Sequence, residues 1–180
     1  MVVIRGTKKF LDRVDGPHVD HPDQPDQQLG SWYANVLFFK PRLALLVNEA
    51  TLLPLFMPLA PAATLLQRFP HELARLLEAH RVAPSFIEPQ VAGARTSVLA
   101  RTVNRRVVGV MTEYAQLADY RRESHHDPTD PLALSIALAR TPMSPLYKTH
   151  TSADRALAAL AAETVGGHQP PPQDTTQRGP

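Results

Sequence analysis

Residues Ser31–Phe39 read SWYANVLFF, and residues Arg42–Val47 read RLALLV. Aromatic and aliphatic residues fill both runs and Lys40-Pro41 is a short connection between them, so we expect two antiparallel strands. A third apolar run at 52–57 extends the pair to a three-stranded meander, and Pro54 places that strand at an edge. Because these runs are apolar on both faces, we expect both faces of the sheet to be covered.

Apolar runs farther along the chain complete the expected fold. Short runs at 2–5 and 95–103 predict two more strands, while 15–28 is a loop without periodic apolar residues. Helical patterns occupy 7–14, 61–68, 70–80, 85–91, 105–120, 131–140 and 155–164, with Asn104 and Asp130 as N-caps of two of them. The sequence therefore predicts an α+β fold: a mainly antiparallel sheet of about five strands, helices packed against it and a helical C-terminal appendage.

The expected domain organisation follows from changes in composition along the chain. Residues 1–122 form the core α+β domain, and residues 123–165 form a helical C-terminal extension. Residues 166–180 are rich in proline and hold no aliphatic side chain, which is typical of a disordered tail.

Composition excludes several classes of protein. The 180 residues are 43% hydrophobic, enough for one domain with a core, and they include no cysteine, which excludes disulfides, cysteine-bound zinc and thiol catalysis. The formal net charge of +2 is small for a dedicated polyanion binder. Three prolines interrupt the most apolar stretch, 52–66, which argues against a membrane span. We expect a soluble, cytoplasmic protein.

Established catalytic and cofactor motifs are missing from the sequence. It contains neither a phosphate-binding glycine loop, nor the dinucleotide fingerprint, nor the serine elbow. Histidine and aspartate gather at 18–23 and 125–127, where turns and solvation explain them. We therefore expect no cofactor and no metal.

Polar side chains inside the apolar runs are the most informative residues about a possible binding site. Asn35 lies in the middle of SWYANVLFF on the same face as Tyr33, and Asn48-Glu49 ends the next run. A buried asparagine without partners costs about 1–3 kcal/mol. Two interpretations stay open: these residues and Trp32 stabilise the fold, or Tyr33, Asn35 and Glu49 face a ligand together with a basic residue.

Four segments in this order also resemble the motifs of a bacterial family, domain of unknown function 6933: IRGTKK from Ile4, LGSWYAN from Leu29, VNEATL from Val47 and TVNRRVVG from Thr102. The resemblance covers about residues 2–118 and implies a compact α+β domain with no assigned activity. Together with Tyr33, the polar or aromatic positions that match the family motifs are candidate binding residues. They are Thr7, Lys8, Trp32, Asn35, Asn48, Glu49, Asn104 and Arg105. Arg106 stands where the family pattern has serine, so a role of that serine does not carry over.

Three functional hypotheses follow. The first is a non-catalytic binding or interaction domain with a polar cleft for a small anionic ligand or a protein partner. The second is binding of nucleic acid or another polyanion through a basic face formed by Lys8, Lys9, Arg101, Arg105 and Arg106. The third is an enzyme with Glu49 as general acid/base beside Lys8 or Arg105. The small net charge and the missing catalytic motifs favour the first.

Overall fold

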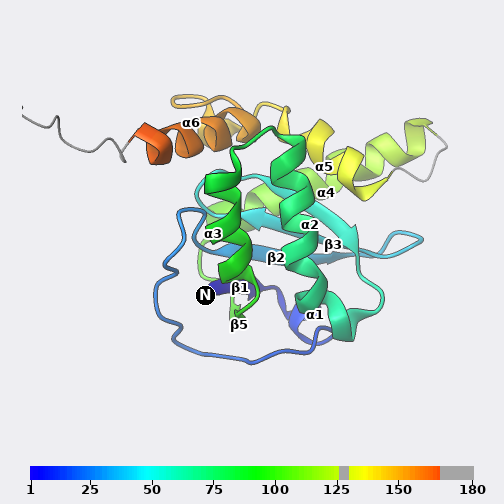
Figure 1. The fold of residues 1–180 in the computed structure, drawn as a ribbon. Helices are drawn as coiled ribbons and strands as arrows, with labels where there is room; N and C mark the ends of the chain where they lie inside the picture. Colours follow the sequence, from blue (N-terminus) through cyan, green and yellow to red (C-terminus); the bar gives the residue numbers. More distant parts are fainter. Residues whose placement is uncertain (126–129, 167–180) are drawn as a thin grey trace, which may run out of the picture.

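The computed structural model describes residues 1–125 and 130–166, and a five-stranded sheet with strand order β4-β3-β2-β1-β5 lies at its centre (Figure 1). The strands are β1 (Val2–Gly6), β2 (Trp32–Leu37), β3 (Leu43–Asn48), β4 (Pro54–Pro58) and β5 (Ser97–Arg101). The helices are α1 (Lys8–Leu11), α2 (Leu65–Ala79), α3 (Pro84–Ala94), α4 (Arg105–His125), α5 (Pro131–Ala139) and α6 (Ala153–Gly166), with 3-10 turns at Ala62–Thr64 and Ser144–Leu146. The expected α+β class is confirmed.

The sheet is mixed rather than mainly antiparallel. Strands β2, β3 and β4 form the expected antiparallel meander, in which Trp32 pairs with Asn48. Strand β1, however, pairs in parallel with both β2 and β5. The connections that lead from β1 to β2 and from β4 to β5 contain helices and cross over the sheet, and such long connections are what join parallel strands.

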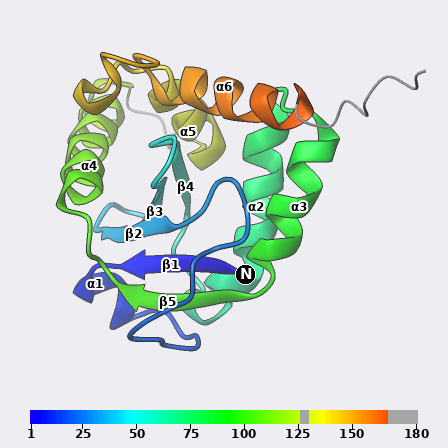
Figure 2. The same ribbon diagram turned by 90° about the vertical axis from the view of Figure 1, so that its left-hand side faces the viewer.

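Helices cover both faces of the sheet, as expected. Figure 2 shows α2 and α3 on one face and α4 on the other. On the first face, the ring of Trp32 packs edge-on against Phe69 of α2, with the ring centroids 5.6 Å apart. On the second, the buried Tyr114 of α4 donates a hydrogen bond to the Leu52 carbonyl at 3.1 Å. Strand β3, between the two layers, is buried along its whole length.

Both edges of the sheet are covered by other segments of the chain. At the β5 edge, the Val19 N–H donates to the Leu99 carbonyl, and the Leu99 N–H donates to the Pro17 carbonyl. At the β4 edge, the Phe56 N–H donates to Ser135 Oγ of α5 at 2.8 Å. These contacts satisfy backbone groups that would otherwise form a pairing surface for another chain.

Helix α2 differs from the expectation of two helices separated near Pro70. It is one continuous helix that contains Pro70, although an internal proline removes a backbone hydrogen bond and costs about 3 kcal/mol. An apolar stripe on the same helix offsets this cost because it is buried against the core. Its members are Leu65, Phe69, Leu73, Leu76 and Leu77.

The C-terminal helices pack on this framework. Helix α5 lies against β4, and Asp130 caps α5 as expected, since its side chain accepts a hydrogen bond from the Ala133 N–H. The proposed division at residue 122 stays a prediction, and the tail at 167–180 lies outside the described residues. Within 1–125 and 130–166, no helix is long and apolar enough to cross a membrane.

Ser135 provides a test of how strongly α5 holds the edge of the sheet. Substituting Ser135→Ala leaves the buried N–H of Phe56 without its partner, so we expect the free energy of unfolding in urea to fall by about 1–3 kcal/mol. The exposed Ser144→Ala is the matched control and should change it by less than about 0.5 kcal/mol. Equal effects of the two variants would contradict the role given to Ser135.

Candidate functional site

Asn48 is completely buried, and its side-chain amide is fully used in hydrogen bonds. Its Nδ2 donates to the Leu29 carbonyl at 2.6 Å and to the Ser31 carbonyl at 3.4 Å. Its Oδ1 accepts from the N–H groups of Ala50 and Thr51 and from the Thr51 hydroxyl, at 3.2, 2.9 and 2.9 Å. These contacts favour the structural interpretation of Asn48, because no polar atom of its side chain is left for a ligand.

Trp32, the neighbour of Asn48 across the β2–β3 pair, lies in the core. Its side chain is buried and packs on Phe69, and its indole nitrogen has no hydrogen-bond partner among the described residues. The contacts of Trp32 are therefore those of a core residue.

Three of the sequence-predicted residues converge in what we call the Glu49 cluster: Tyr33, Glu49 and Asn104. Glu49 Oε1 accepts hydrogen bonds from the Tyr33 hydroxyl at 3.2 Å and from Asn104 Nδ2 at 3.0 Å. Asn104 also caps α4 as expected, because its Oδ1 accepts from the Arg106 N–H at 3.0 Å. The cluster thus ties the start of α4 to β2 and to the end of β3.

The environment of Tyr33 favours its neutral, hydrogen-bond-donating form. Burial raises the pKa of the Tyr33 phenol above its usual value of 10.0, and the Glu49 carboxylate raises it further, against an opposing effect of Arg5. Arg5 is half-buried and donates from Nη1 to the Arg101 carbonyl at 3.4 Å. A protonated Tyr33 therefore serves as a fixed donor to Glu49.

Thr7 and Asn35 form a separate pair at the end of β1. The Thr7 hydroxyl donates to Asn35 Oδ1 at 2.8 Å, and the Thr7 N–H donates to the Ala34 carbonyl at 2.8 Å. Asn35 Oδ1 also accepts from the Val36 N–H at 2.9 Å. Thr7 stands at the N-cap position of α1 but gives no side-chain cap to it. The pair joins β1 to β2.

A hollow of about 740 Å³ lies at the carboxyl ends of the parallel strands β1 and β5, between α1 and the loop that covers β5. Among the predicted site residues, Lys8 lines it, and its ammonium is paired with Asp12 at 2.8 Å. Asp12 also lines the hollow, and the other polar side chains of the lining are His18, Asp20, Arg101 and Thr102. The sequence drew attention to His18 and Asp20 as possible metal ligands, but it did not place them in a hollow, because the hollow depends on parallel pairing of β1 and β5, which the sequence did not predict.

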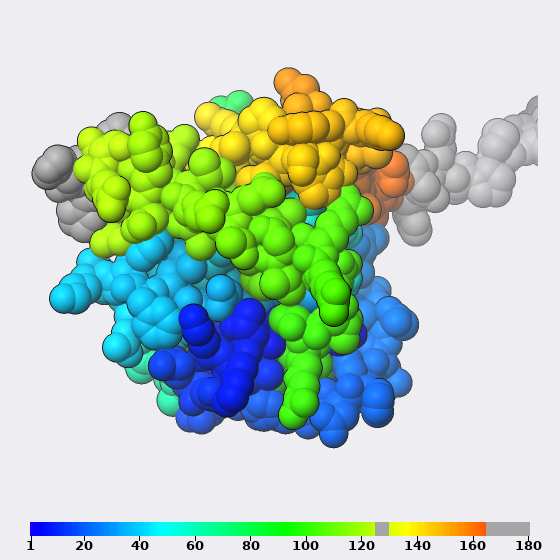
Figure 3. All heavy atoms as spheres, turned by 180° about the vertical axis from the view of Figure 1, so that it is seen from behind, coloured from blue at the N-terminus to red at the C-terminus, as the bar shows by residue number. Residues whose placement is uncertain are grey.

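The five cations of the predicted basic face lie in different surroundings. Lys8 and Lys9 belong to α1, and Arg101 lines the hollow. Arg105 is exposed at the start of α4, while Arg106 is held by the C-terminal segment through a hydrogen bond to the Pro145 carbonyl at 2.8 Å. Figure 3 shows the face on which α4 lies, with the N-terminal segment in blue beside α4 and the end of β5 in green.

Potential metal ligands do not gather in the described parts of the chain. No group of three or more histidine, aspartate or glutamate side chains there could hold a metal ion. Of the sequence cluster at 125–127, residues 126 and 127 lie outside the described residues.

Comparison with protein families matches residues 3–156 to the family described as Domain of unknown function (DUF6933). The chain belongs to this family. The DUF6933 match includes β1 from Val3 onward, the other four strands, the Glu49 cluster and the hollow, and it confirms the resemblance found in the sequence. Comparisons with curated proteins and with solved structures give no match.

The raised pKa of Tyr33 predicts how the stability of this DUF6933 domain changes in alkali. Folded Tyr33 keeps its proton to a higher pH than the unfolded chain does, so the free energy of unfolding falls as the pH rises above about 10. The buried Tyr114, whose pKa burial also raises, contributes with the same sign. We expect Tyr33→Phe to make this decline shallower in urea titrations between about pH 9.5 and 11.5.

The exposed Tyr120→Phe is the control for this experiment and should keep the wild-type slope. A Tyr33→Phe variant with an unchanged slope would show that the phenol is not held neutral by its surroundings.

Proposed function

We propose that this DUF6933 domain is a non-catalytic binding domain whose ligand, a small polar molecule with an anionic group, occupies the hollow. The observation that carries the proposal is a lysine and an arginine lining a concave site at the carboxyl ends of adjacent parallel strands. In open parallel α/β sheets, ligands bind in a crevice at these ends where neighbouring connections separate, and β1 and β5 belong to the parallel part of this mixed sheet. The hollow's volume of about 740 Å³ fits the range of ~300–1,000 Å³ typical of ligand pockets.

The charges of the hollow support a ligand that carries an anionic group and a hydrogen-bond donor. Lys8 is paired with Asp12, but both side chains are largely exposed, and exposed ion pairs are weak enough for an incoming anion to replace. Arg101 offers a second cation from the end of β5. Asp20, on the loop across the hollow, offers a carboxylate to a donor group of the ligand.

The surroundings of Glu49 support a role in positioning rather than in catalysis. Among the described residues, its carboxylate accepts hydrogen bonds from Tyr33 and Asn104, and Glu49 is not among the residues that line the hollow. Within the described residues, no hydrogen bond or ion pair joins Glu49 to Lys8 or Arg105, the two partners that an acid/base role would use. The cytoplasmic location expected from the sequence stays a prediction.

Thermal unfolding with a panel of small polar molecules tests the proposal. The probes are inorganic phosphate, nucleoside monophosphates, dicarboxylates and amino acids. A ligand at about 100 times its Kd stabilises the folded state by about 2.7 kcal/mol. For a chain of this length, we expect that to raise the Tm by about 5–10 °C.

The double variant Lys8→Gln/Arg101→Gln should lose this shift, because both cations of the hollow are removed. Arg105→Gln is the matched control, since Arg105 is exposed nearby in sequence but does not line the hollow. The proposal is wrong if none of the probes raises the Tm, or if the double variant responds like the wild type.

A further inference from the structure

Phe38, directly after β2, is a large apolar side chain that the fold leaves half exposed, at 51%. Three cations surround its ring: Lys9 Nζ lies 5.5 Å from the ring centroid, and the guanidinium carbons of Arg13 and Arg42 lie at 5.2 and 5.7 Å. Lys9 and Arg13 come from α1 and the turn after it, whereas Arg42 lies in the connection between β2 and β3, directly before β3. We call these four residues the Phe38 patch.

Within the described residues, no ion pair neutralises the positive charge of the Phe38 patch. Among the described residues, no carboxylate lies within ion-pair distance of Lys9, Arg13 or Arg42. The Arg13 guanidinium donates to the Lys9 carbonyl at 2.8 Å, which fixes the geometry but adds no negative charge. Three like charges around one ring repel each other, and attraction to the ring offsets this repulsion only in part. An anion placed among them would relieve it.

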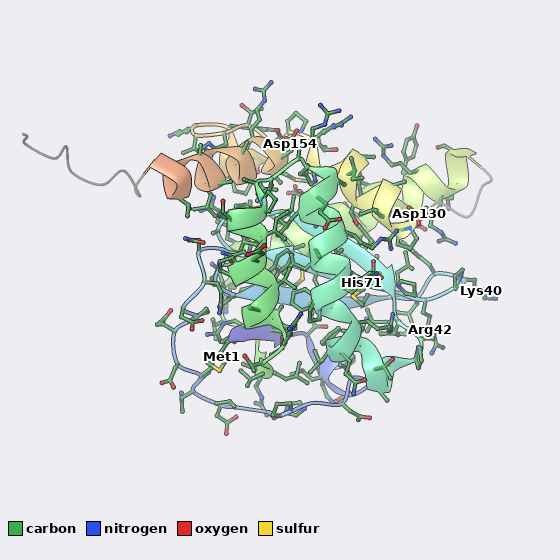
Figure 4. The ribbon with its side chains drawn as sticks, viewed as in Figure 1. Met1, Lys40, Arg42, His71, Asp130 and Asp154 are labelled. Carbon is green, nitrogen blue, oxygen red and sulfur yellow. The ribbon has the colours of Figure 1, made fainter. Side chains whose placement is uncertain are left out.

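A second pair of ring and cation, Phe39 and Arg122, lies at the next residue of the hairpin. The Arg122 guanidinium lies 4.2 Å from the ring centroid of Phe39 and donates to the Lys40 carbonyl at 3.5 Å. Asp119, 3.7 Å from Arg122, neutralises that cation in part. Figure 4 shows Lys40 and Arg42 at the hairpin that projects from the side of the molecule. The hairpin thus carries two aromatic rings, and cations from the α1 region and from α4 lie close to them.

We propose that the Phe38 patch binds single-stranded nucleic acid, with a base stacked on Phe38 and backbone phosphates at Lys9, Arg13 and Arg42. An exposed aromatic ring among cations is the combination that single-strand binding uses, because unpaired bases stack while the phosphates need positive charge. An acidic peptide would use the charges without requiring the ring, and an anionic membrane would require an apolar side chain at this position rather than a flat ring on which a base can stack.

This surface differs from the basic face expected from the sequence, with which it shares only Lys9. The net charge of +2 does not indicate this local concentration of positive charge, because the cations gather where α1 meets the hairpin. It also shares no residue with the hollow, so this inference and the proposed function can fail separately.

Fluorescence anisotropy with a labelled oligothymidylate or oligouridylate of about 12 nucleotides tests the inference on the full chain. Three phosphate contacts predict a slope of log K against log salt concentration of about −2. Arg42→Gln should weaken binding and reduce the slope by about 0.7, while the exposed Arg95→Gln should change neither.

The ring is tested by Phe38→Leu, which keeps an apolar side chain but removes the stacking surface. We expect a loss of affinity of about 5- to 100-fold. Tyr147→Leu is the matched control, because Tyr147 is also exposed, at 62%, and is not part of the patch; it should bind like the wild type.

Three results would overturn the inference. One is the absence of binding by either oligonucleotide at about 50 mM salt, where phosphate contacts are strongest. Another is binding that Phe38→Leu leaves unchanged. The third is binding of polyglutamate or of phosphatidylserine vesicles that depends on Phe38 and that the oligonucleotide does not displace.

Discussion

The buried side-chain amide of Asn48 holds together three segments on which the rest of the structure depends. Asn48 lies at the end of β3. Its side chain donates a hydrogen bond to the Leu29 carbonyl, in the segment that leads into β2, and accepts one from the Thr51 N–H, in the turn that leads to β4. Each backbone group left without such a partner in the core would cost about 1–3 kcal/mol. Because the turn is fixed, the Leu52 carbonyl stands where Tyr114 of α4 can reach it, and Glu49 stands beside Tyr33.

Polar residues of this domain therefore divide into two groups with different roles. Asn48, the Glu49 cluster and the Thr7–Asn35 pair use their side chains on each other and on the backbone, which sets the positions of β1, β2 and α4. The side chains to which we assign ligands line the hollow or belong to the Phe38 patch, and those that carry a charge are exposed. The first group builds the framework that places the second.

Local patterns made part of this architecture predictable from the sequence. The meander, the coverage of both sheet faces and the N-caps at Asn104 and Asp130 each depend on residues close together in the chain. The parallel pairing of β1 with β5 could not be predicted, because a five-residue apolar run does not specify its neighbour or direction. The hollow was missed for that reason, and the Phe38 patch was missed because Phe38 reads as part of a buried strand that in fact ends at Leu37.

Urea unfolding of Asn48→Ala compared with Asn35→Ala tests the central claim most directly. Both variants remove an asparagine of the sheet, but Asn48 is completely buried with both ends of its amide hydrogen-bonded, whereas Asn35 is only partly buried. The account predicts that Asn48→Ala lowers the free energy of unfolding by at least about 3 kcal/mol, or abolishes cooperative unfolding, and that Asn35→Ala costs about 1 kcal/mol. Equal losses in the two variants would contradict it.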